Sequence, residues 1–362
     1  MLNFCVLSRK ASPRLIPFLA TLVASSLPLA ARAAHERPYV ADTAQARVIQ
    51  TIDLPGQATW KQALPVRDGS VFLLRNEGRG ETTTPYLLRL PAGSAIPGPF
   101  QPDWSGRPDA AQHAARFHPV AMATNSDGSL WLVDQGASGD TPHLLRLDAA
   151  TGAVIASHEL PPEALSAQSR FASLAVHGET AYLADEGGIA LVAFDWHRHA
   201  ATRFFAGYPT SRGHVPLTID HKVVQAADNR PLTRDIAYLA LETDGAWLYE
   251  MAPTGPIYRL SSALLTDTTV TPAELMEGVT QWRGIPTIGG ITIDNRATLY
   301  MTDISEGRLL SFDTGRHPHI LLSMPALVQA AMPGWKASTA PGSASGEIYI
   351  PVSHQLLRIA LP

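Results

Sequence analysis

The chain has 362 residues, with 28 Lys and Arg against 32 Asp and Glu. Its first 33 residues hold four of the basic residues and no acidic one, so the remainder has 24 basic and 32 acidic residues and a net charge near −8. This balance argues against nucleic acid or anionic lipid as the main partner, because both need a positive surface. Cys5 is the one cysteine and lies in those first residues, which excludes disulfides, thiolate metal sites and a cysteine nucleophile from the rest.

Residues 1–33 are typical of a secretory signal peptide. A basic start precedes an apolar stretch at residues 15–30, and Ala-Arg-Ala at residues 31–33 predicts cleavage before Ala34. A membrane anchor is the alternative, but the stretch is short for a span and is broken by two serines and a proline. The sequence therefore predicts a secreted or periplasmic protein with no membrane span after cleavage. Residues 34–45 are expected to form a linker.

From residue 46 onward one pattern recurs six times: a short apolar strand, a polar turn, a second strand with an aromatic residue, a break, and a third strand. Residues 118–136 (HPVAMATNSDGSLWLVDQG) show its first half most clearly. The aromatic residues of the second strands are Phe72, Trp131, Tyr182, Tyr249, Tyr300 and Tyr349. Their even spacing suits four-stranded blades and disfavours a β-sandwich or several small β-domains. The sequence predicts an all-β, six-bladed β-propeller over residues 46–362.

The sixth repeat ends at the C-terminus after its third strand. Residues 46–54 (ARVIQTIDL) read as a strand without a blade of its own. We expect this strand to complete the last blade, which closes the ring and removes an open sheet edge. A single helical turn is expected at residues 272–278. No stretch longer than this one has the pattern of an amphipathic helix.

Propeller geometry predicts where a site lies. The first strand of each blade starts at the face where the second strand ends, so these ends converge around the channel mouth. Three positions after the aromatic residues come Arg75, Asp134, Asp185, Ala252, Asp303 and Val352. The expected starts of the first strands add Trp60, His118, Arg170 with Phe171, Arg234 with Asp235, and Trp335 with Lys336. Together they predict a pocket of mixed charge with aromatic walls, in which Glu250 is the alternative residue for the fourth blade.

A purely structural role stays open for these side chains. An Asp at a strand end also caps turn amides or pairs with a neighbouring Arg. Buried charges need partners, so Arg75, Arg170 and Arg234 are expected to pair with some of the acids.

Four segments resemble, in order, the major royal jelly protein/yellow family. They are LWLVDQG (130–136), AYLADEGGIALVAFDW (181–196), IAYLALETDGAWLYEMAPTGPIYRLSSALL (236–265) and GGITIDNRATLYMTDISEGRLLSF (289–312). The resemblance implies a six-bladed propeller that is usually secreted, in a family of dopachrome-converting enzymes, binders of biogenic amines and nutritional proteins. The family has no agreed set of catalytic residues that could be transferred to this chain. The cysteines typical of its insect members are missing here. The low charge content, with many Ala and Pro, is typical of a bacterial member.

The function favoured by the sequence is binding of a small aromatic or cationic metabolite in the mouth. The ligand would stack on Trp60, Phe171 or Trp335 and pair with Asp134, Asp185 or Asp303. The alternative is an enzyme of the same propeller class, either a dopachrome-converting tautomerase-like protein, in which His118 or an Asp moves a proton, or a metal-dependent gluconolactonase-like hydrolase. A scaffold with only structural charges in its mouth is the third possibility.

No metal or cofactor is assigned. In the regucalcin/gluconolactonase proteins, which are similar six-bladed propellers, Glu, Asn and Asp hold a divalent metal, but Gly289 stands where that Asp is expected. The pairs His197 with His199 and His317 with His319 have a metal-binding spacing. Both pairs are expected on an outer hairpin, without a third ligand.

Overall fold

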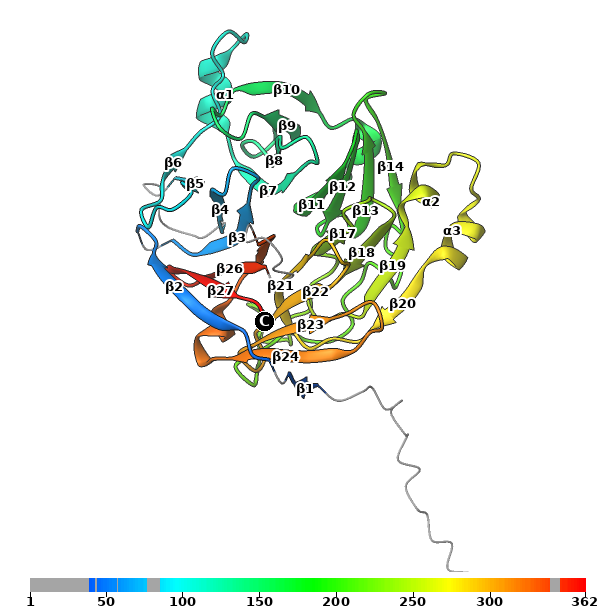
Figure 1. The fold of residues 1–362 in the computed structure, drawn as a ribbon. Coiled ribbons are helices and arrows are strands. Elements are labelled where there is room, and N and C mark those ends of the chain that lie inside the picture. The colour runs from blue at the N-terminus through cyan, green and yellow to red at the C-terminus, as the bar shows by residue number, and fades with distance from the viewer. Residues whose placement is uncertain (1–38, 43, 57, 77–84, 339–345) are drawn as a thin grey trace, which may run out of the picture. The chain divides into compact units, whose positions relative to one another are not determined.

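Six β-sheets stand around a central channel, and within each sheet the strands lie side by side from the channel to the rim (Figure 1). The computed structural model describes residues 39–42, 44–56, 58–76, 85–338 and 346–362. The expected signal peptide and its cleavage site lie outside these residues. The six sheets confirm the predicted β-propeller.

Within each blade the strands follow one another in chain order from the channel outward. The first three blades contain β3 (Trp60–Pro65), β4 (Val71–Arg75), β5 (Leu87–Leu90) and β6 (Gly98–Phe100); β7 (Pro119–Thr124), β8 (Leu130–Asp134), β9 (His143–Leu147) and β10 (Val154–Glu159); and β11 (Phe171–His177), β12 (Thr180–Asp185), β13 (Ala190–Asp195) and β14 (Ala200–Phe204). The other three contain β17 (Tyr238–Leu241), β18 (Trp247–Met251), β19 (Ile257–Ser261) and β20 (Thr280–Arg283); β21 (Ile288–Ile293), β22 (Leu299–Asp303), β23 (Arg308–Phe312) and β24 (Pro318–Ser323); and β25 (Gly334–Lys336), β26 (Glu347–Val352) and β27 (Gln355–Ala360).

The sixth blade is completed from the other end of the chain. Strand β2 (Arg47–Asp53) pairs antiparallel with β27 along its whole length. This pairing confirms the closing strand expected at residues 46–54. A second N-terminal strand, β1 (Val40–Ala41), lies in the stretch expected to be a linker and adds a parallel strand to the outer edge of β24.

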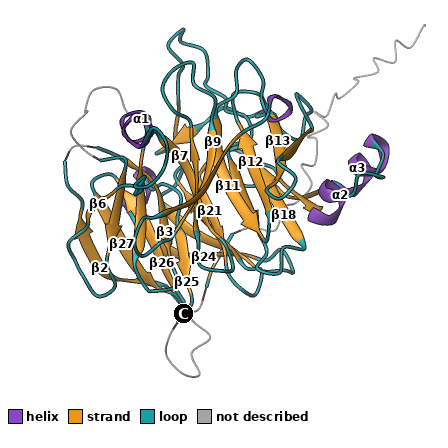
Figure 2. Ribbon diagram, turned by 90° about the horizontal axis from the view of Figure 1, so that it is seen from above, coloured by secondary structure: helices purple, strands orange, loops and turns teal. Residues whose placement is uncertain are grey.

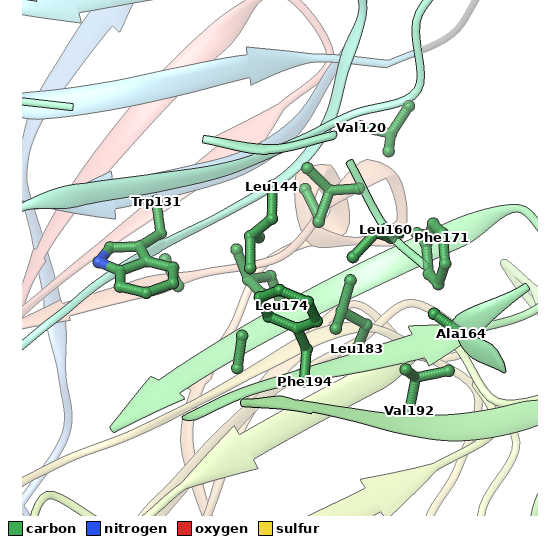
Figure 3. Packing of buried hydrophobic residues seen from close by; sticks show 14 of the residues in the cluster. Val120, Trp131, Leu144, Leu160, Ala164, Phe171, Leu174, Leu183, Val192 and Phe194 are labelled. Carbon is green, nitrogen blue, oxygen red and sulfur yellow. The ribbon is translucent and has the colours of Figure 1, made fainter. Parts of the chain in front are cut away.

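The aromatic residues of the second strands anchor the hydrophobic core. All six are at most 5% exposed. Figure 3 shows one of the clusters that fill the spaces between blades, where Trp131, Leu174 and Phe194 meet between blades two and three. Trp131 also meets Trp196 edge to face, with ring centroids 4.5 Å apart. Such aromatic contacts between sheets hold each blade at a fixed distance from its neighbour.

Helices lie only in the connections between strands of the described chain. They are α1 (Ala110–Arg116), α2 (Ser262–Thr266), α3 (Pro272–Gly278) and the 3-10 turns Pro162–Ala164 and Pro325–Gln329. The third coincides with the helical turn expected at residues 272–278, and Thr271 and Glu274 form a capping box at its start. Figure 2 shows α2 and α3 at the edge of the molecule, beyond β18. None of the helices in the described ranges is long and apolar enough to cross a membrane.

The connection between blades three and four is the longest of the described loops between blades. It carries a small hairpin of β15 (Thr218–Ile219) and β16 (Lys222–Val223). The backbone N–H of Asp220 donates to the carbonyl of Ile304 at 3.1 Å. This loop therefore reaches past the fourth blade to the fifth, on the face where the first strands begin.

Candidate functional site

The face where the first strands begin holds a pocket of about 230 Å³ beside the channel. Four cationic side chains and one carboxylate line it: Lys61, Arg75, Arg170, Arg234 and Glu186. Four of the residues predicted for the mouth are therefore brought together: Arg75, Arg170, Arg234 and Phe171. Lys61 and Glu186 were not predicted as site residues. Each directly follows a predicted one, Trp60 and Asp185, and this adjacency is the sequence feature that points to them.

Glu186 organises two of the arginines. Arg234 donates to both of its carboxylate oxygens, from Nε at 2.6 Å and from Nη2 at 3.0 Å, and Arg170 Nη2 lies 3.0 Å from Oε2. Burial alone would raise the pKa of Glu186, but the hydrogen bonds and charges of the two arginines outweigh it and lower that pKa. Glu186 is therefore ionised at neutral pH. The side chain of Arg170 remains 59% exposed.

On the other side of the pocket, Arg75 lies over an aromatic ring. Its guanidinium carbon is 4.2 Å from the centroid of Tyr86, whose ring lies 4.9 Å from that of His118. His118 Nδ1 is 3.3 Å from the carbonyl oxygen of Gly136. Lys61 Nζ donates to the carbonyl oxygen of Val120 at 2.5 Å. Tyr86 and His118 thus lie beside Arg75, outside the set of residues that line the pocket.

Asp185 and Asp303 do not face this pocket. Both are completely buried. Arg203 Nη1 lies 2.7 Å from Asp185 Oδ2, and Arg308 Nη2 lies 2.6 Å from Asp303 Oδ2. Each aspartate also accepts a backbone N–H from the turn that follows it, from Gly188 for Asp185 and from Ser305 for Asp303. Asp235 likewise accepts a backbone N–H, from Gly213 at 2.9 Å.

The tryptophans expected as walls lie elsewhere. Trp60 is 3% exposed and belongs to the core cluster between blades six and one. Phe171, in contrast, contributes to the lining of the mouth pocket, but it is only 1% exposed, and Figure 3 shows it in the cluster between blades two and three. Trp335 lies at the opposite end of the channel, because Lys336 pairs with Glu347 at the start of β26. The sixth blade begins near Ala330 instead, because Ala330 forms a β-bridge with Val352, the last residue of β26.

Glu250 is completely buried within β18, opposite Leu239 of the neighbouring strand. Neither of its carboxylate oxygens has a hydrogen-bond partner within the described residues. Burial raises the pKa of Glu250 to about 8. It is therefore an interior acid that is largely protonated at neutral pH, rather than a group at the mouth.

The opposite end of the channel forms a second cavity, of about 360 Å³. All six first strands contribute to its lining, including Gln62, Asn125 and Trp335. Glu242, which also lines it, accepts a hydrogen bond from Tyr249 Oη at 2.9 Å. This end has one carboxylate and no lysine or arginine among its lining residues.

The paired histidines occupy the outer hairpins. His199 contacts His158 with ring centroids 3.8 Å apart, and His317 Nδ1 lies 2.9 Å from Asp313. His319 lies 3.8 Å from Asp42. Within the ranges that the structure describes, no group of three or more His, Cys, Asp or Glu side chains has an arrangement suited to a metal ion.

The profile of the Major royal jelly protein family matches residues 120–319. The chain belongs to this family. The match confirms the resemblance carried by the four segments of the sequence. A comparison with curated proteins finds no match.

Solved structures with the same fold are distant in sequence. The virginiamycin B lyase of Staphylococcus aureus is 10% identical, with a TM-score of 0.51, and the alignment covers 88% of this chain and 100% of the lyase chain. A streptogramin B lyase is 12% identical, with a TM-score of 0.48, and the alignment covers 88% of this chain and 98% of that one. At 10% identity the likeness to the virginiamycin B lyase shows the propeller fold alone.

Proposed function

We propose that this family member binds a small anionic metabolite in the mouth pocket. The observation that carries the proposal is the set of four cationic side chains around about 230 Å³, with Glu186 as the one carboxylate among the lining residues. Glu186 holds Arg234 and Arg170 in place. A carboxylate, phosphate or sulfate group fits such a site, because guanidinium and ammonium groups bind these anions with charge-assisted hydrogen bonds.

This proposal changes the ligand charge favoured by the sequence. Asp185 and Asp303 were expected to attract a cation, but an arginine already neutralises each of them. Neither Trp60 nor Trp335 offers the mouth a stacking surface, and Phe171, which lines the pocket, is only 1% exposed. An anion is also drawn to a local positive pocket in an acidic chain, because a cleft focuses the field of the charges that line it.

The test is a panel of small ligands matched in shape and opposite in charge, such as propionate, benzoate and inorganic phosphate against propylamine and benzylamine. We expect the anions to raise the melting temperature of the full chain and to bind less tightly as salt increases. Arg170→Gln should weaken binding about tenfold or more, since one charge-assisted hydrogen bond is lost. Arg198→Gln, at an exposed position on a hairpin of blade three, serves as the control. Binding of the amines without the anions would refute the proposal.

We also propose that the protein is exported and cleaved before Ala34, so that the functional chain contains the propeller of residues 46–362. The support is the sequence pattern of residues 1–33. Mass spectrometry of the protein recovered from the cells that make it should find Ala34 as the first residue. An intact N-terminus in the cytoplasm would contradict export.

A further inference from the structure

The second strands of blades three and five end in aspartates that share one arrangement. Oδ1 of Asp185 and of Asp303 each accepts two backbone N–H groups, at distances from 2.8 to 3.3 Å. Oδ2 of each accepts a hydrogen bond from an arginine, Arg203 at 2.7 Å and Arg308 at 2.7 Å. The guanidinium compensates each buried carboxylate for its lost hydration.

Asp134 ends the second strand of blade two and is only 7% exposed. Its Oδ1 accepts the backbone N–H groups of His118 and Gly136, at 2.8 and 3.0 Å. Oδ1 therefore repeats the arrangement of the other two aspartates. Its Oδ2 accepts no hydrogen bond from any residue in the described part of the chain.

In blade three the arginine comes from the fourth strand, β14, and the residue across from Asp185 is Ala190, so the register comparison uses blade five. In blade five the residue directly across from Asp303 is Arg308. In blade two the residue directly across from Asp134 is His143. An imidazole is shorter than an arginine side chain, so the space that a guanidinium fills in blade five is left beside Asp134 in blade two. Burial raises the pKa of Asp134, although two backbone hydrogen bonds and the charges of His143 and His118 act to lower it.

A cavity of about 370 Å³ adjoins Asp134. Helix α1 closes it from outside, and Figure 1 places this helix at the rim of the ring, beside β10. No residue of a first strand lines it, so it is separate from the mouth. Glu159 stands at its far side, 3.8 Å from His143. Arg116, which also lines it, already pairs with Asp140 at 2.9 Å.

We propose that this rim cavity binds a small organic cation with a guanidinium or primary ammonium group, which donates to Asp134 Oδ2 as Arg308 does to Asp303. Asp109, Asp140 and Glu159 also line the cavity, and Glu159 suits a further amino group at the other end of the ligand. The volume lies in the range of small-molecule pockets. The pairs Asp185 with Arg203 and Asp303 with Arg308 show within one chain that this carboxylate geometry accepts a guanidinium.

Agmatine, which carries both groups, is the probe, and ligand-observed NMR with the full chain measures its dissociation constant. Asp134→Asn keeps an oxygen to cap the turn and removes the charge, so we expect agmatine to bind at least tenfold more weakly. His143→Arg supplies an internal guanidinium at the register position of Arg308. It should abolish agmatine binding while far-UV circular dichroism and the melting temperature show an intact fold.

Two controls separate this site from general charge effects and from the mouth. His197→Arg makes the same chemical change at an exposed position of another blade, and it should bind agmatine like the unmodified chain. Arg170→Gln should also leave agmatine binding unchanged, so failure of the anion site and failure of the rim cavity are distinguishable. No binding of agmatine to the unmodified chain, or equal binding to a folded His143→Arg variant, would overturn the proposal.

Discussion

Glu250 makes the stability of the propeller depend on pH in an unusual direction. Its carboxyl is completely buried, and neither oxygen has a partner among the described residues. Burial raises its pKa from the ordinary 4.5 to about 8. A carboxylate that ionised here would lose its hydration without gaining a compensating bond. The folded chain therefore holds this proton more tightly than the unfolded chain does.

The sign and size of the effect follow from proton linkage. Below pH 4.5 the group is protonated in both states and does not affect the pH dependence. Between pH 4.5 and about 8 the unfolded chain releases the proton and the folded chain keeps it, so the free energy of unfolding falls by about 1.4 kcal/mol per pH unit. Over that whole interval the loss amounts to about 5 kcal/mol, a large part of the stability of an ordinary domain.

The assay is urea unfolding of the full chain at several pH values from 5 to 9, compared with Glu250→Gln. The amide has the shape of the protonated acid and no charge, so the two proteins should be similarly stable at pH 5. At pH 9 the variant should be more stable by about 3–5 kcal/mol. Glu163→Gln, at an exposed position, is the matched control and should follow the unmodified chain. Parallel curves for the Glu250→Gln variant and the unmodified chain would refute the reasoning.

Three further predictions concern the fold. Arg308→Met should destabilise the chain by about 3–5 kcal/mol, because it leaves the fully buried Asp303 without its cation; adding Asp303→Asn should recover much of that loss in urea unfolding, and no recovery would contradict the pairing. Trp131→Ala should lower the free energy of unfolding by about 3–5 kcal/mol, and calorimetry showing an unchanged midpoint would speak against its anchoring role. Deletion of residues 47–53 should expose the edge of β27 and produce oligomers on size exclusion, whereas a stable monomer would argue against closure.

The repeating part of the fold was readable from the sequence, because each blade carries its own strong local signal. An aromatic residue such as Trp131 lies inside an apolar strand and is followed by a turn and another apolar strand. The closing strand was readable for the same reason, since a strand without a partner and a blade without a fourth strand imply each other. The sixth blade broke the pattern, because β25 has only three residues. Its start was therefore placed too late, and Trp335 was assigned to the wrong end of the channel.

The site was predicted less well because partners across strands are invisible in a linear sequence. The three aspartates at the strand ends look alike in sequence, yet Asp185 pairs with Arg203, 18 positions later, and Asp303 with Arg308, five positions later. Asp134 has a histidine across the strand pair instead. Arg170 and Arg234 were expected to pair with acids, and both pair with Glu186, which was not foreseen.

Ring closure by β2 also constrains how the chain can fold. Arg358 of the last strand bonds to Gln50 of the first blade-forming strand, across 308 positions of sequence. During synthesis β2 is made long before its partner β27, so five blades can assemble before the ring is complete. Contacts so distant in sequence form slowly, since a very long loop must close first. An incomplete sixth blade exposes the edge of β27, so the pairing of β2 also removes a strand edge on which another chain could add a strand.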